Sequence, residues 1–215
     1  MPKKPYHHGD LRNALIQAGI AILAKDGVGG LSLRRTARQA GVSHAAPYAH
    51  FPDKPALIAA IATEGYRRLH ERMTAAIERR AGDPLRQLLE GAGAYLDFAL
   101  ADPAHFRITL SGVVEKEQDY PDLVAMTQQS FDLLRRLVTE AQAAGVLRPG
   151  PADLMAVSLW GAVHGLVILV LDEQVSRTVL SRFSLAQMLL NTLSQFTLVP
   201  LPASFRPTAA LKPRR

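Results

Sequence analysis

Cysteine is absent from the 215-residue sequence, which excludes a disulfide framework, a thiolate metal site and a cysteine nucleophile. The sequence also lacks any stretch in which apolar and polar residues alternate with a period of two, the pattern of a half-buried β-strand. Its first eight residues carry charge but lead into no apolar segment, so they do not form a secretory signal. Together these absences predict a helical protein that stays in the cytoplasm.

Sequence motifs that carry catalysis are missing as well. There is no Gly-x-Ser-x-Gly elbow, no Gly-x-Gly-x-x-Gly after a strand, no Walker lysine and no His-Glu-x-x-His, and the seven histidines show no metal-ligand spacing. Ser158 and His164 lie six residues apart in one expected helix, on opposing sides, so they are poorly placed to act as nucleophile and base. We therefore expect no enzyme, no catalytic residue, no metal site and no cofactor.

Helix-forming residues are abundant, and they predict an all-α fold. In the first third, four helices are expected over residues 10–26, 32–40, 43–51 and 53–80. Their N-caps are expected at Asp10, Ser32, Ser43 and Asp53. Further along, proline-containing breaks divide the chain into about five more helical segments. These breaks are Gly82-Asp83-Pro84, Asp102-Pro103, Asp119-Tyr120-Pro121 and Pro149-Gly150-Pro151.

Residues 31–51 have the spacing of a helix-turn-helix. Leu33 and the small residues after it form an inner face where a second helix can cross closely. Gly41 suits the left-handed backbone of the turn, and Val42 can fill the angle between the helices. Ser43 leaves free N–H groups at the start of the second helix, and such a helix end can face a phosphate or a base edge.

The formal charge of +6 is unevenly distributed along the chain. Residues 1–55 carry a balance of +5, residues 56–199 carry −3 and residues 200–215 carry +4. A basic terminal domain is expected when a protein meets a polyanion, although a solvated basic surface without a partner gives the same balance. The expected organisation is a disordered basic arm (1–9), a helix-turn-helix DNA-binding domain (10–55), a larger helical domain (56–199) and a disordered basic tail (200–215).

The helix-turn-helix region resembles the TetR/AcrR family of transcriptional regulators. The resemblance is carried by Gly41-Val-Ser-x-x-x-x-Tyr48-x-His50-Phe51-x-x-Lys54-x-x-Leu57 and is specific over about residues 10 to 60. It implies an N-terminal three-helix domain joined by a linking helix to a larger C-terminal helical bundle, and it makes residues 56–199 the ligand-sensing and dimerisation domain. One departure is Pro47, where leucine is common, and we expect a proline in the first helical turn to be tolerated.

The resemblance also implies a role for each position that faces DNA. Arg34 matches a place that often contacts a base edge, where a guanidinium can bond a guanine. Contacts to bases are expected from His44, Ala45 and Ala46, and contacts to phosphates from Ser43, Tyr48, His50 and Lys54. The alternative for Tyr48 is that it only packs, with its hydroxyl in water. Few of these side chains can form bidentate bonds, so DNA shape is expected to contribute to specificity.

The second half of the chain resembles the family less specifically. Asp102-Pro-Ala-His-Phe106 and Trp160-x-x-x-His164-Gly165 carry the likeness, and the latter is similar to a subgroup with a C-terminal Trp…His-Gly signature. The resemblance implies a mainly apolar cavity for a small hydrophobic or weakly polar effector. Its expected walls are Phe98, Phe106, Leu110, Phe131, Trp160 and His164. The alternative for His164 is a buried histidine that is hydrogen-bonded to a neighbour.

A homodimer is expected through two long helices, at about 152–172 and 178–198. The second helix carries an apolar stripe formed by Leu185, Leu189, Thr192 and Phe196. The uncharged stretch 154–171 is also long enough for a short transmembrane span. However, it stands alone and is followed by Asp172-Glu173 rather than by Lys or Arg, so we expect a helix buried in a soluble dimer and no membrane partner.

These features together predict a transcriptional repressor. It is expected to bind double-stranded operator DNA at an inverted repeat as a homodimer and to be released by the effector. The alternatives are a non-specific basic DNA-binding or chromosome-organising protein, and an activator of the same family.

Overall fold

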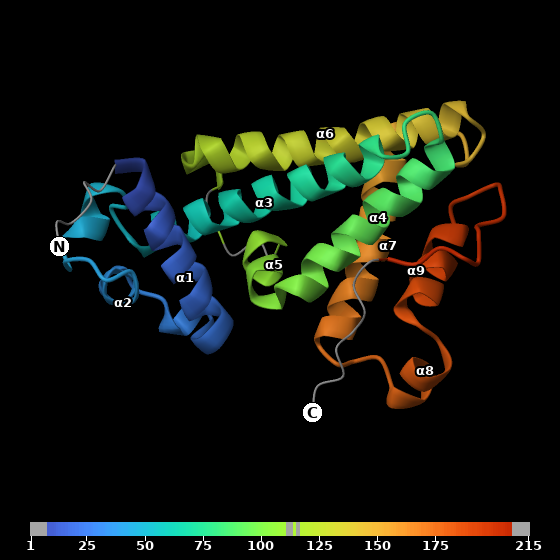
Figure 1. Ribbon diagram of the computed structural model, residues 1–215. Coiled ribbons are helices and arrows are strands. Elements are labelled where there is room, and N and C mark those ends of the chain that lie inside the picture. Colours follow the sequence, from blue (N-terminus) through green and yellow to red (C-terminus); the bar gives the residue numbers. More distant parts are fainter. Residues whose placement is uncertain (1–7, 111–113, 115–116, 208–215) are drawn as a thin grey trace. The chain divides into compact units, whose positions relative to one another are not determined.

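The computed structural model describes residues 8–110, 114 and 117–207, with side chains from residue 11 onward. Within these ranges the chain is all-α, as predicted, and its one β-type pairing is an isolated bridge between Leu147 and Thr197. The helices are α1 (His8–Gly30), α2 (Leu33–Gln39), α3 (Lys54–Glu78), α4 (Pro84–Ala101), α5 (Pro103–Leu110), α6 (Pro121–Ala143), α7 (Ala152–Leu171), α8 (Arg177–Arg182) and α9 (Leu185–Ser194), with 3-10 turns η1 (Ala46–Ala49) and η2 (Glu117–Asp119) (Figure 1). Residues 1–7 of the predicted arm and 208–215 of the predicted tail lie outside the described residues.

The proline-containing breaks divide the helices where the sequence predicts. Helices α4, α5 and α6 each begin on the proline of a break, and α7 begins directly after Pro151. The carboxylate of Asp83 accepts a hydrogen bond from the backbone N–H of Arg86 at 3.0 Å, and Asp102 caps α5 in the same way through the N–H of His105 at 3.1 Å. Proline is tolerated at these starts because the first N–H groups of a helix have no partner within it.

By packing, the chain forms two compact units. The first unit comprises Met1–Arg67 and Asp102–Thr127, and the second comprises Arg68–Ala101 and Gln128–Arg215. Helices α3 and α6 therefore contribute to both. The predicted boundary near residue 55 separates a DNA-binding domain from a ligand-sensing domain, and it stays a prediction. In terms of packing, the first half of α3 and all of α5 belong with the N-terminal helices.

The core of the first unit lies between α1, α3 and α5. Leu15 and Ile22 of α1 are buried in one cluster with Leu57 and Ile61 of α3 and Ile108 of α5. The α1 residues belong to the apolar face that the sequence predicts, because positions three or four apart share one side of a helix. Helix α5 packs directly on α1, so it is a structural part of the unit that carries the helix-turn-helix.

The end of α1 is bent and is held by cations. Gly27 has a φ of +66°, so the regular helix ends before it, as predicted, and a short further turn follows. The Nζ of Lys54 donates to the carbonyl of Val28 at 2.8 Å, and the guanidinium of Arg35 donates to the carbonyl of Gly30 at 3.2 Å. These bonds satisfy carbonyls that have no partner within the helix and place positive charge at the negative end of its dipole.

Two predicted N-caps are wrong. Helix α1 already begins at His8, so Asp10 lies inside it. Ser43 opens no α-helix, because the predicted helix 43–51 is reduced to the 3-10 turn η1, which has no side-chain cap. The reason is Pro47, which lacks the N–H that an α-helix would direct to the carbonyl of Ser43. The N–H of Ala46 donates to that carbonyl instead, at 3.0 Å, which is the tighter 3-10 pattern.

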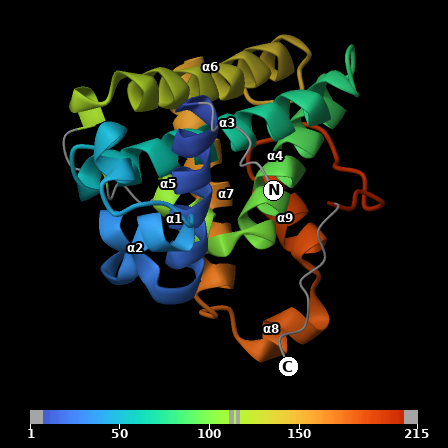
Figure 2. The same cartoon turned by 60° about the vertical axis from the view of Figure 1, so that its left-hand side comes forward.

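In the second unit, α7 packs against α4 and α9 (Figure 2). One face of α7 is buried in these contacts, and its buried residues are Ala156, Leu159, Val163, Val167 and Val170. The opposite face is free within the chain: Leu154 is 67% exposed and Val157 is 52% exposed. Helix α7 is therefore apolar on both sides, but only one side is covered.

The predicted helix 178–198 is not continuous. It is divided into α8 and α9 because Ser184 caps α9 in a capping box, in which its oxygen accepts from the N–H of Gln187 and the Gln187 side chain accepts from the N–H of Ser184 at 2.8 Å. Leu185 and Leu189 of the predicted stripe are buried, and α9 packs on α7 of the same chain. Thr192 and Phe196 are half-buried. Most of this stripe is thus covered within the chain.

The described part of the predicted tail, residues 200–207, is non-helical and contacts α4. A β-carbon at Gly93 would lie 3.1 Å from Cζ of Phe205 and 3.9 Å from Cα of Pro207. The absence of a side chain at Gly93 therefore allows the phenyl ring to approach the backbone of α4.

Candidate DNA-binding and ligand-binding sites

The helix-turn-helix is fixed by backbone bonds and one cap. Ser32 caps α2 as predicted, because its hydroxyl accepts from the N–H of Arg35 at 3.2 Å. Gly41 has a φ of +71°, the left-handed conformation that the sequence predicts, and the N–H of Val42 donates to the carbonyl of Ala37 at 3.0 Å. Ala37 and Leu33 are buried beneath the turn. The direction of the segment after the turn is thereby set by local geometry.

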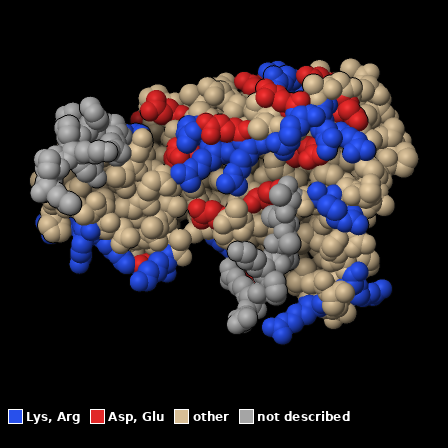
Figure 3. Space-filling model, in the orientation of Figure 1, with Lys and Arg blue, Asp and Glu red and all other residues tan. Residues whose placement is uncertain are grey.

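Most of the predicted DNA contacts lie on the surface around this turn. Arg34, Ser43, His44 and Ala45 are exposed, Tyr48 is 53% exposed and Ala46 is half-buried. Lys and Arg side chains gather over α2 in Figure 3. One of them, Arg35, is neutralised by an ion pair with Asp26. Arg34 has no such partner among the described residues, which leaves its guanidinium available to a base edge.

Two predicted phosphate contacts are directed into the protein instead. Lys54 bonds the end of α1, as described above. The Nε2 atom of His50 is buried and has no hydrogen-bond partner among the described residues. His50 lines a pocket of about 180 Å³ together with Arg12 of α1, Thr63 of α3 and Tyr120 before α6, all within the first unit. The ammonium of Lys54 keeps two further N–H donors beside this bond, and the phosphate contacts of Lys54 and His50 stay predictions.

In the second unit, three polar side chains meet beside an apolar cavity. The indole N–H of Trp160 donates to the hydroxyl of Tyr95 at 3.3 Å, and that hydroxyl lies 2.7 Å from Nδ1 of His164. Since an indole N–H can only donate, the Tyr95 oxygen accepts from Trp160 and its own hydrogen stays available for Nδ1 of His164. Burial lowers the pKa of His164, which favours the neutral ring that can accept this bond. The histidine is hydrogen-bonded to a neighbour but only half-buried, and its role as a ligand contact stays a prediction.

The cavity itself has a volume of about 50 Å³. Tyr95 and Trp160 are the polar members of a wall that is otherwise apolar, lined by Met73, Leu88, Gly91, Ala92, Leu134, Leu137, Leu159, Val163 and Leu193. Of the predicted wall residues, Trp160 lines the cavity. His164 does not line it but is hydrogen-bonded to Tyr95, which does, whereas Phe98 and Phe131 lie elsewhere in the second unit. Phe106 and Leu110 belong to the first unit.

Similarity to known proteins agrees with this arrangement. Residues 15–61 match the family described as bacterial regulatory proteins, tetR family, and residues 88–193 match the tetracyclin repressor-like C-terminal domain. A protein of unknown function from Rhodococcus sp. RHA1 is 35% identical, and its structure gives a TM-score of 0.73 over 90% of this chain and 96% of that chain. YobS of Bacillus subtilis, an uncharacterised HTH-type transcriptional regulator, is 25% identical over 169 residues, which are 79% of this chain and 83% of YobS. A TetR family transcription regulator from Marinobacter aquaeolei VT8 shares the fold at 19% identity, with a TM-score of 0.66 over 87% of this chain and 95% of that chain.

The chain belongs to the TetR family of transcriptional regulators. The first match contains the helix-turn-helix and the exposed residues beside its turn, and the second contains the Tyr95, Trp160 and His164 cluster. This family is one of transcriptional regulators, which are generally not enzymes. Among the described residues no group of three His, Cys, Asp or Glu side chains could hold a metal ion.

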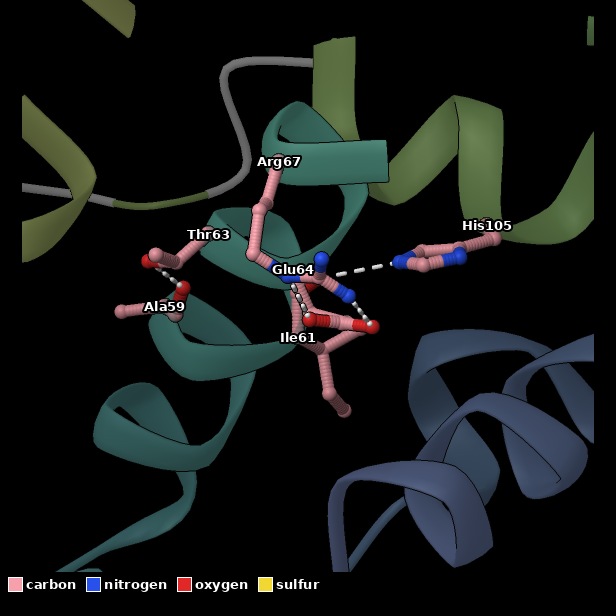
Figure 4. Close-up of polar contacts among 6 residues, drawn as sticks. All are labelled: Ala59, Ile61, Thr63, Glu64, Arg67 and His105. Carbon is pink, nitrogen blue, oxygen red and sulfur yellow. Dashed lines mark hydrogen bonds and ion pairs between the residues drawn. The ribbon is translucent and has the colours of Figure 1, made fainter. Parts of the chain in front are cut away.

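One polar junction of this TetR-family regulator was missed from the sequence. His105 of α5 is 1% exposed, and its Nε2 lies 3.0 Å from the carbonyl of Ile61 in α3 (Figure 4). Beside it, a β-carbon at Gly65 would lie 1.8 Å from Oγ1 of Thr109, so the two helices approach as closely as a glycine permits. The hydroxyl of Thr109 donates to the carbonyl of His105 at 2.8 Å. A glycine inside a long helical pattern was the available signal, but only packing reveals its partner.

Proposed function

We propose that this TetR-family regulator is a repressor that binds an inverted-repeat operator as a homodimer and is released by a small, mainly apolar effector. The observation that carries the proposal is the set of exposed residues on both sides of a hydrogen-bonded turn, with Arg34 near the start of α2 and Ser43, His44 and Ala45 after the turn. Side chains on a fixed backbone can read base edges, because their register on the duplex does not vary. The action is expected in the cytoplasm, where the operator is reached.

Charge supports sequence-specific rather than bulk DNA binding. Positive and negative side chains are interspersed along α3 in Figure 3. Several of these charges form ion pairs, such as Arg67 with Glu64 and Arg80 with Glu90. Non-specific binding relies on an extended basic surface, since each phosphate contact adds affinity regardless of sequence. Around the turn, by contrast, residues 27–52 contain no Asp or Glu, and Arg34 and Arg38 are exposed.

The free face of α7 supports the homodimer. Leu154 and Val157 are more than half exposed, and a β-carbon at Gly161 or Gly165 would meet nothing within 4 Å. Helix α7 is long and apolar enough to cross a membrane, and only 28% of its most apolar window is buried within the chain. A second copy of the chain covers such a face most simply, because a two-fold axis lays one α7 against the other and the glycines let the backbones approach.

The cavity supports an effector that is apolar. Its wall offers few polar groups and no acidic or basic side chain, so a highly charged compound would be poorly solvated there. The ligand must bind the arrangement without DNA more tightly than the arrangement on DNA. A preference of about 100-fold corresponds to about 2.7 kcal/mol, which is enough to shift occupancy substantially.

The test begins with selection of genomic fragments by the purified full-length protein. Bound fragments are expected to share an inverted repeat, and affinity for that repeat should exceed affinity for random DNA by about 1,000-fold or more at physiological salt. Equal affinity for both DNAs would show a non-specific binding protein instead. Reporter expression from the selected promoter separates a repressor from an activator. A compound library is then titrated while operator release and Trp160 emission are followed together.

A further inference from the structure

One side chain of the second unit lines the cavity and also faces solvent. Trp160 is 39% exposed, whereas the other residues that line the cavity are buried or half-buried. Its neighbours on α7 that also line the cavity, Leu159 and Val163, are only 2% and 6% exposed. Trp160 is therefore the most exposed residue of the cavity wall.

The indole is held in place by one long hydrogen bond and by a tilted ring contact with His164, whose centroid lies 6.2 Å away. Its N–H donates to the hydroxyl of Tyr95 at 3.3 Å, beyond the usual range for such bonds, whereas the same hydroxyl lies 2.7 Å from Nδ1 of His164. Tyr95 comes from α4 and is 6% exposed. Tyr95 and His164 thus form a short hydrogen bond between α4 and α7. The bond from Trp160 to Tyr95 is the longer and weaker of the two.

We propose that the side chain of Trp160 gates the effector cavity, and that an uncharged aromatic or aliphatic ligand enters by displacing the indole from the hydroxyl of Tyr95. The inference rests on the proposed function, in which this cavity receives the effector. A cavity of about 50 Å³ holds one or two water molecules, whereas small-molecule sites occupy about 300–1,000 Å³, so part of the wall must move. Trp160 is the lining side chain that can turn outward without leaving a packed core. The remaining wall is apolar apart from Tyr95, which sets the class of ligand.

The experiment uses N-phenyl-1-naphthylamine, an uncharged aromatic probe whose emission rises in apolar surroundings, and the full-length protein. Trp160→Ala removes the side chain to be displaced and is expected to bind the probe about tenfold more tightly. Tyr95→Phe keeps the ring but deletes the hydroxyl, and about fivefold tighter binding is expected, the equivalent of one ordinary hydrogen bond. Leu169→Ala is the matched control, because Leu169 is 43% exposed on the same helix and does not line the cavity.

A second readout follows the exposure of the Trp160 side chain. Trp160 is the only tryptophan, so acrylamide quenching of its emission reports its exposure. Quenching is expected to increase when the probe binds the unaltered protein and the Tyr95→Phe variant. This measurement and Tyr95→Phe decide the question if Trp160→Ala does not fold, as judged by circular dichroism.

Several results would overturn the proposal. They are equal probe affinity in Trp160→Ala, Leu169→Ala and the unaltered protein, weaker binding by Trp160→Ala, quenching that falls on binding, or no binding by any variant. Because no DNA is present, these results are independent of the regulator's role. A compound that binds in the cavity behind Trp160 without releasing the operator would refute effector control but not the gating role of Trp160.

Discussion

Two helical glycine sites, one in each packing unit of this regulator, differ in what surrounds them. In the first unit, Gly65 lies where α5 presses on α3, and any side chain there would meet Thr109. In the second unit, a β-carbon added at Gly161 or Gly165 of α7 would have no neighbouring atom within 4 Å. The comparison shows that a glycine can fix a contact inside a chain or leave room for one with another chain. The surface around Gly65 is covered by a helix of the same chain, whereas the α7 face that carries Gly161 and Gly165 is not.

The largest effect is expected from filling the closed glycine. Gly65→Val should lower the free energy of unfolding by about 3 kcal/mol, because overpacking forces α5 away from α3 and strains their buried contact. Thermal and urea unfolding measure the loss. Gly161→Val, which places the same residue in the same kind of helix but on a free face, is the control and should change the unfolding of the monomer little. Equal losses in both variants would contradict the difference between the units.

Filling the open glycine should instead act on assembly. Gly161→Leu is expected to weaken dimerisation by about 1–3 kcal/mol, since a side chain prevents close approach of two α7 helices. Sedimentation velocity over a range of concentrations measures the dissociation constant, and circular dichroism checks that helix content is retained. A stable monomer of the unaltered protein at micromolar concentration would remove the α7 dimer altogether.

A smaller difference is expected between two cations of the first unit. Arg34→Ala should cost about 1–3 kcal/mol in operator binding and relax base preference, because it removes a contact to a base edge. Lys54→Ala should weaken binding to all DNA sequences similarly and reduce the salt slope by about one. It should also destabilise the end of α1, since its Nζ bonds Val28. Fluorescence anisotropy with operator and random duplexes distinguishes the two, and equal losses on both DNAs for Arg34→Ala would show that it reads no base.

The smallest effect concerns pH in the second unit. Burial lowers the pKa of His164 relative to its value in the unfolded chain, about 6.5. The unfolded state therefore binds more protons, and the contribution of His164 to stability is present above pH 6.5 and declines as the pH falls toward the lower pKa of the folded state. Melting temperatures between pH 7.5 and 5.5 should fall more steeply for the unaltered protein than for His164→Gln. Parallel slopes would show that His164 does not contribute.

Helix positions and the turn could be predicted because they depend on neighbours in the chain. Ser32 and Asp102 cap helices through residues three positions away, Gly41 adopts the positive φ that glycine permits, and Pro84, Pro103 and Pro121 each begin a helix. The same local logic explains the error at residues 43–51, because the missing N–H of Pro47 removes a hydrogen bond that an α-helix needs there. It also explains the break at Ser184, whose capping box can be read as Ser-x-x-Gln.

The sequence by itself determined the all-α fold, the family and the exposed residues of the turn, since each follows from periodicity or from a motif within a short stretch. Only the tertiary structure decided which face of α7 is free, that Lys54 and His50 are directed into the protein, and that Phe106 and Leu110 pack in a different unit from Trp160. These facts depend on contacts between residues far apart in the chain. An apolar residue has the same reason to be buried against any helix, so its hydrophobicity predicts burial but does not name the partner.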